Sequence, residues 1–142
     1  MRSLTRSWPG AAKLALSLMA MAVAAGILSL AVQGRQTKVA DRETAVAMTG
    51  GDPRAGLAAI ERHGCGACHE IPGAPLTQGR VGPALDKVAV RAFIGASLPN
   101  TPQAMIDFVA QPEHVQPQGG MPVMPLTQAE ARDIAAYLYT LR

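Results

Sequence analysis

The chain of 142 residues contains only two cysteines, three histidines and few aromatic residues (one Trp, two Tyr and two Phe). Two cysteines exclude a disulfide framework unless Cys65 and Cys68 pair with each other, and a four-ligand zinc site would lack its second half. Few aromatic side chains leave little large apolar surface for the core of a small domain. Strand-like alternation and internal repeats are absent as well, so the sequence does not predict a β-sheet fold.

Positive charge is concentrated at one end of the chain. Residues 1–43 hold six Lys and Arg against two acidic residues, a net charge of +4, whereas residues 44–142 hold seven against eight, a net charge of −1. The high isoelectric point therefore belongs to the N-terminal end. We predict no nucleic-acid partner for the rest of the chain.

An apolar run without charge extends over nineteen residues, from Leu14 to Val32. As a helix it would be about 28 Å long, close to the thickness of the hydrocarbon layer of a bilayer. Arg2, Arg6 and Lys13 precede it and favour a cytoplasmic N-terminus with the remainder exported. Two interpretations stay open. The length favours a retained transmembrane anchor (1–33), whereas the small residues at 22–24 and 39–40 are compatible with cleavage of a signal peptide.

The rest of the chain divides into a predicted linker and a predicted domain. Residues 34–51 have few apolar positions and no sustained period, so we expect a flexible linker. The domain covers 52–142. Capping residues, prolines and apolar periodicity predict helices over Asp52–His63, Asp86–Ala96, Asn100–Gln111 and from the capping box Thr127-Gln128-Ala129-Glu130 onward, with Gly/Pro-rich loops over Ile71–Pro83 and Glu113–Pro125.

The most informative motif is Cys65-Gly66-Ala67-Cys68-His69. Two thiols three positions apart on one turn can each add to a vinyl group of one porphyrin, and the following histidine then lies under the iron as an axial ligand. The competing interpretation is a redox Cys-x-x-Cys pair. That motif is expected after a strand in a βαβ unit, and nothing strand-like precedes Cys65. The motif therefore predicts one covalently attached haem c.

From Gly51 to Arg142 the sequence resembles the class I mono-haem cytochromes c, in particular bacterial membrane-associated ones and the haem domain fused to subunit II of some haem-copper oxidases. The resemblance rests on the attachment motif and on Val81-Gly82-Pro83-Ala84-Leu85, Leu98-Pro99-Asn100-Thr101-Pro102, Met121-Pro122, Leu126-Thr127 and Ala135-Ala136-Tyr137-Leu138.

This resemblance implies an all-α, class I cytochrome c fold around one covalently bound haem, preceded here by one N-terminal transmembrane helix. The first and last helices of the domain should cross, with Gly56 and Ile60 meeting Ile134 and Tyr137. The carbonyl of Pro83 should accept a hydrogen bond from the nitrogen of His69 that does not bind iron, which would fix the ring and strengthen it as a ligand.

Three methionines could supply the sixth iron ligand. Met105 lies on an apolar helix stripe, so we predict that it packs in the core. The resemblance favours Met121, because the Met-Pro of the family falls six residues before the capping residue of the last helix, as Met121 does before Thr127. Met124, also followed by proline, is the alternative.

Other side chains near the predicted haem have weaker assignments. His114 as a ligand would give a bis-histidine site, and His63 is too close in sequence to His69 to reach the opposite face. Otherwise both are ordinary surface histidines. Arg80 and Arg91 are candidate partners of the haem propionates, for which the alternative is a solvated arginine.

Ligation by His and Met fills both axial positions, so we predict an electron carrier rather than an enzyme, with no small-molecule substrate. The resemblance implies a bc-type complex as donor and a terminal oxidase as acceptor in a respiratory chain. The apolar run and the basic residues before it predict a single pass through the inner (cytoplasmic) membrane, with the haem domain on the periplasmic side. The alternatives are a fixed haem-bearing subunit of a membrane oxidase or dehydrogenase complex, and a haem enzyme or gas sensor with a labile methionine.

Overall fold

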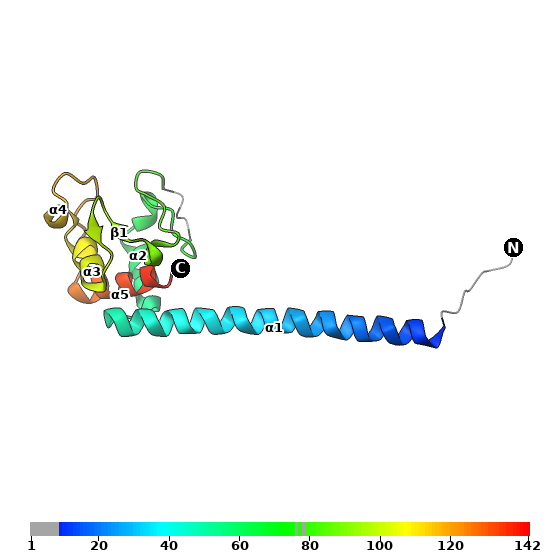
Figure 1. The fold of residues 1–142 in the computed structure, drawn as a ribbon. Helices are drawn as coiled ribbons and strands as arrows, with labels where there is room; N and C mark the ends of the chain where they lie inside the picture. The colour runs from blue at the N-terminus through cyan, green and yellow to red at the C-terminus, as the bar shows by residue number, and fades with distance from the viewer. Residues whose placement is uncertain (1–8, 76, 78) are drawn as a thin grey trace. The chain divides into compact units, whose positions relative to one another are not determined.

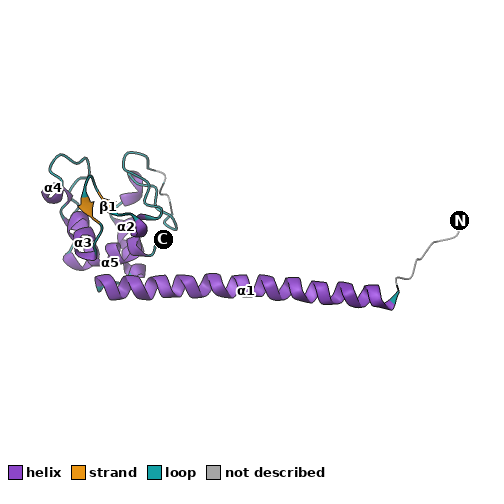
Figure 2. Ribbon diagram, in the orientation of Figure 1, coloured by secondary structure: helices purple, strands orange, loops and turns teal. Residues whose placement is uncertain are grey.

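A computed structural model describes residues 9–75, 77 and 79–142 (Figures 1 and 2). Its elements, in chain order, are α1 (Gly10–Thr49), α2 (Pro53–Arg62), the 3₁₀ turns η1 (Cys65–Ala67) and η2 (Val88–Val90), β1 (Phe93–Ile94), β2 (Leu98–Pro99), α3 (Pro102–Ala110), α4 (Pro112–Val115) and α5 (Gln128–Tyr139). The chain divides into two compact units after residue 37. Arg2 and Arg6, on which the predicted orientation of the N-terminus depends, lie outside the described residues.

The first unit consists of the apolar part of α1. Its large apolar side chains between Leu14 and Val32 are exposed, from 44% for Val32 to 70% for Leu30. The helix is long and apolar enough to cross a membrane, as the sequence predicts. By length and composition, a signal sequence near the N-terminus has the same properties.

The expectation of a flexible coil over residues 34–51 is wrong, because α1 continues without a break to Thr49. Ala45 and Thr49, one helical turn apart, are buried in the second unit. Asp41, one turn earlier, places its carboxylate 3.3 Å from the guanidinium of Arg142. The buried strip is narrow and made of small side chains, so it leaves no strong apolar period in the sequence.

The second unit (38–142) is organised by the crossing of α2 and α5. A Cβ at Gly56 would overlap the carbonyl oxygen of Asp133, so the two backbones touch where Gly56 stands. Ile60 and Ile134 are buried in the same cluster, with Tyr137 packed against it. The predicted crossing of the first and last helices of the domain is confirmed.

A polar contact joins the C-terminal end of α2 to α5. Arg62 and His63 each lie 3.2 Å from the same carboxylate oxygen of Glu130. That carboxylate also accepts the backbone N–H of Thr127, completing the predicted capping box. The Thr127 backbone N–H, then His63 and the Thr127 hydroxyl, lower the pKa of Glu130 to about 2. Glu130 therefore stays ionised and binds both helices at neutral pH.

The region between the motif and α3 differs from expectation. The helix predicted over Asp86–Ala96 is wrong: only the turn η2 forms there, followed by β1, which pairs antiparallel with β2. Lys87 has a positive φ of 52°, which breaks helical continuity. The side-chain amide of Asn100 instead donates hydrogen bonds to the carbonyls of Val88 and Arg91. In a continuing helix these carbonyls would accept N–H groups of later residues.

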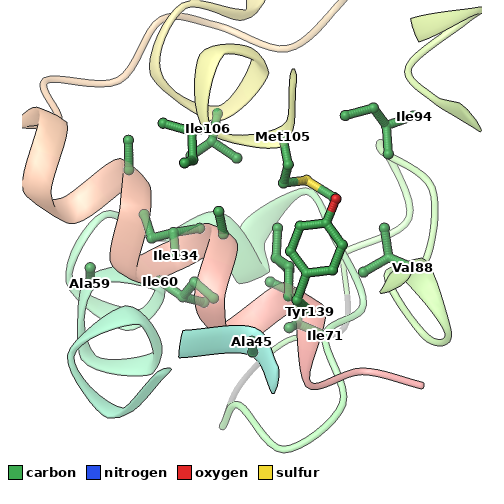
Figure 3. Close-up of a cluster of buried hydrophobic side chains, with 14 residues drawn as sticks. Ala45, Ala59, Ile60, Ile71, Val88, Ile94, Met105, Ile106, Ile134 and Tyr139 are labelled. Carbon is green, nitrogen blue, oxygen red and sulfur yellow. The ribbon is translucent and has the colours of Figure 1, made fainter. Parts of the chain in front are cut away.

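The other helix signals are confirmed by their caps. Asp52 and Thr101 accept the backbone N–H of Arg54 and Ala104, and each precedes a proline at the first helical position. The short helix α4, which begins at Pro112 and extends into the predicted loop over Glu113–Pro125, was not predicted. Apart from the short β1–β2 pair, the described residues form the helix-rich fold that the sequence predicts. Buried side chains of the second unit form one cluster (Figure 3).

We predict that Gly56→Ala destabilises the second unit by about 1–3 kcal/mol, because the added Cβ would force α2 away from α5. The matched control is Ala58→Val, which adds bulk at an exposed position of the same helix. Denaturant unfolding of the purified protein measures both variants. Equal midpoints for Gly56→Ala and the parent chain would contradict the close crossing.

Candidate haem-attachment site

The attachment motif begins three residues after the end of α2. Gly64 has a φ of 68°, a conformation that favours glycine, and turns the chain into η1. The carbonyl of Cys65 then accepts the backbone N–H groups of Cys68 at 3.2 Å and His69 at 3.0 Å. Both thiols and the imidazole are thereby carried on one tight turn.

A second segment, residues 79–85, runs alongside the motif. Three backbone hydrogen bonds join them: Gly79 N to Gly66 O (3.1 Å), Gly82 N to Cys68 O (2.8 Å) and Leu85 N to Glu70 O (2.8 Å). A Cβ at Gly82 would lie 2.7 Å from Nδ1 and 2.9 Å from Nε2 of His69. Only glycine lets this backbone lie directly on the imidazole ring, a requirement that sequence reasoning missed.

His69 is held by the segment that lies against it. Its Nδ1 lies 2.8 Å from the carbonyl oxygen of Pro83. Because a carbonyl oxygen only accepts, Nδ1 must carry the hydrogen, and Nε2 keeps its lone pair. The hydrogen bond implied by the resemblance is present, and it leaves His69 in the tautomer that binds a metal through Nε2.

The two cysteines are free thiols, both half-buried. Burial, with a smaller contribution from the nearby Cys68, raises the pKa of the Cys65 thiol. Redox-active Cys-x-x-Cys pairs instead have a nucleophilic thiol of lowered pKa. The thiol environment therefore does not support a thiol–disulfide oxidoreductase.

These groups fit a haem better than a bare metal ion. Among the described residues, no three His, Cys, Asp or Glu side chains lie together as ligands for an ion. Two thiols beside one oriented imidazole match a group that is attached through carbon–sulfur bonds and needs one histidine from this side. Large apolar side chains that are more than half exposed also occur in the segments after the motif: Val81, Val90, Phe93 and Val123.

The three methionines considered as iron ligands differ in burial. Met105 is 2% exposed in the core, which confirms its predicted packing role (Figure 3). Met121 and Met124 are both half-buried in the loop before α5. The carbonyl of Met124 accepts the N–H of Leu126 at 2.7 Å, in a tight turn at the start of α5. The choice of Met121 as axial ligand, with Met124 as alternative, stays a prediction.

The remaining histidines and arginines have the following positions. His63 contacts Glu130, as described above, and His114 is exposed on α4. Arg80 is exposed. One terminal nitrogen of Arg91 donates to the carbonyls of Ala84 (2.6 Å) and Asp86 (2.7 Å). Propionate contacts of Arg80 and Arg91 stay predictions.

Two thiols on one turn, followed by an imidazole oriented through Nδ1, on a small helical domain, define a c-type haem protein. Comparison with family models gives the same result: the cytochrome c model matches residues 54–142. The chain belongs to the cytochrome c family, for which covalently bound haem and electron transport are implied. A comparison with curated proteins finds no match.

We predict that Gly82→Ala reduces the amount of haem that the protein retains, because the new Cβ would displace the His69 ring. Gly120→Ala is the matched control, since a Cβ there meets nothing within 4 Å. The ratio of haem absorbance to protein after purification measures the effect. Equal haem content in the two variants would show that the contact between Gly82 and the ring is unimportant.

Proposed function

We propose that this chain is a single-haem electron carrier, anchored in the inner membrane, that passes electrons from a bc-type complex to a terminal oxidase in a respiratory chain. The observation that carries the proposal is the hydrogen bond between His69 and Pro83 beside the attachment motif, in a chain of the cytochrome c family. This bond prepares Nε2 as a strong, fixed ligand.

The residues have separate roles in this proposal. Cys65 and Cys68 bond to the haem, and His69 binds the iron on one face. Met121 binds it on the other face, with Met124 as alternative. When bound, the haem supplies a one-electron Fe(II)/Fe(III) couple. If His69 and one of these methionines both bound the iron, no site would be left for oxygen or peroxide, as expected for a carrier rather than an enzyme.

The membrane part of the proposal is supported by α1. Its exposed apolar surface suits lipid, and the basic residues before it favour export of the haem domain to the periplasmic side. A cut after Ala40 would fall inside α1, directly before Asp41, whose carboxylate pairs with Arg142. This placement favours a retained anchor over a signal peptide cleaved at that point.

Electron transfer in isolated membranes tests the proposed partners. Addition of a quinol should reduce the haem, an inhibitor of the bc-type complex should block this reduction, and cyanide should block reoxidation. The double variant Cys65→Ala/Cys68→Ala is the control and should lack the signal. Reduction that persists with the bc-type complex inhibited would exclude it as the donor. Stoichiometric co-purification with oxidase or dehydrogenase subunits would favour the fixed-subunit alternative.

Replacement of each loop methionine tests the axial ligand. Met121→Ala should remove the weak thioether-to-ferric-iron absorption band, open the iron to carbon monoxide and lower the midpoint potential, because a soft ligand that favours ferrous iron is lost. Met124→Ala is the matched control and should keep the band, at a packing cost of about 1–3 kcal/mol. The opposite pattern would assign the iron to Met124.

A further inference from the structure

Asn100 makes three side-chain hydrogen bonds to separate parts of the second unit. Its Nδ2 donates to the carbonyls of Val88 and Arg91, both at 2.8 Å. Its Oδ1 accepts the hydroxyl of Tyr139 on α5, also at 2.8 Å. Since two carbonyl oxygens face one end of the amide, that end must be the nitrogen. The amide therefore ties the η2 segment to the last helix.

Tyr139 is suited to donate in this arrangement. Its side chain is 2% exposed, and burial raises the pKa of its hydroxyl. The hydroxyl therefore keeps its hydrogen throughout the neutral range. A buried tyrosine on a long helix gives Asn100 a rigid partner.

Arg91 links Asn100 to the haem-attachment site. Its backbone carbonyl accepts a hydrogen bond from Asn100. Its guanidinium donates to the carbonyls of Ala84 and Asp86. These carbonyls are one and three residues beyond Pro83, whose own carbonyl accepts the hydrogen of His69 Nδ1. Hydrogen bonds thus connect Tyr139, through Asn100 and Arg91, to the peptide segment that orients His69.

We propose that Asn100 is a positioning residue for His69, acting through Arg91 on the backbone that presents the Pro83 carbonyl. The inference rests on the proposed haem-binding role of His69. A firmly placed carbonyl keeps the Nδ1 hydrogen bond short, which increases the donor strength of the imidazole toward iron. A stronger donor favours ferric iron and lowers the midpoint potential, so loss of the positioning should raise it.

The test uses the full-length holoprotein and the variant Asn100→Asp, which keeps the size of the side chain and the acceptor for Tyr139 but, when ionised, has no donor for either carbonyl. The added negative charge by itself favours ferric iron and lowers the potential, so a rise in potential must come from the weaker His69 ligand. Two quantities are measured: the rate at which the His69 Nδ1 hydrogen exchanges with solvent in the reduced protein, by NMR, and the midpoint potential. We expect exchange to be faster by about tenfold, the factor that corresponds to one hydrogen bond, and the potential to rise.

Arg91→Gln should produce the same changes, and the double variant should change no further than the larger single effect, because both residues act on one segment. Arg91→Lys, which keeps one donor nitrogen, should restore part of the protection. The matched control is Ile106→Val, which weakens the buried core on α3 without touching these hydrogen bonds and should leave both quantities unchanged.

The possible failures are distinguishable. If the parent chain holds no covalent haem, the proposed function fails. If it does and Asn100→Asp leaves the exchange rate and potential unchanged, the positioning role fails alone. If Ile106→Val changes both as strongly, Asn100 contributes only stability and the inference is overturned. Should Asn100→Asp not accumulate, Asn100→Ala removes both donors, together with the acceptor for Tyr139, and is judged by the same outcomes.

Discussion

The contact between Gly56 of α2 and the carbonyl of Asp133 on α5 leaves no room for a side chain. This close approach sets the angle and depth at which α2 crosses α5. Cys65 follows within three residues of the end of α2, so the position of the attachment motif depends directly on that crossing. The ionised Glu130 strengthens the same junction, since it contacts Arg62 and His63 where α2 ends.

From this crossing, α5 makes hydrogen bonds to two segments that follow the motif in the chain. The Tyr137 hydroxyl donates to the carbonyl of Pro72 at 2.7 Å, in the loop that follows His69. The Tyr139 hydroxyl donates to Asn100. Burial raises the pKa of both tyrosines, so both remain donors at neutral pH. One helix therefore holds the loop that follows His69 and, through Asn100, the segment that carries η2.

The last turns of α1 belong to the same compact unit. Ala45 and Thr49 are buried there with very small side chains, and Asp41 pairs with the C-terminal residue. Sequence reasoning missed this helix because it searches for large apolar residues at helical spacing. Small residues that permit close packing produce only a weak pattern, and the charged residues that precede them (Lys38, Asp41, Arg42 and Glu43) resemble those of a linker.

The sequence by itself determined the features whose partners lie a few residues apart. The spacing of Cys65, Cys68 and His69 and the caps at Asp52, Thr101 and Thr127 are local, so residue type and interval were sufficient to predict them. Tertiary structure decided the rest. A turn and a short strand form where a helix was expected over 86–96. Asn100 bonds to Tyr139, 39 residues further along the chain. Both features depend on where the helices cross. Spacing cannot encode such contacts, because a side-chain hydrogen bond between distant segments forms only after packing has brought them within 3 Å of each other.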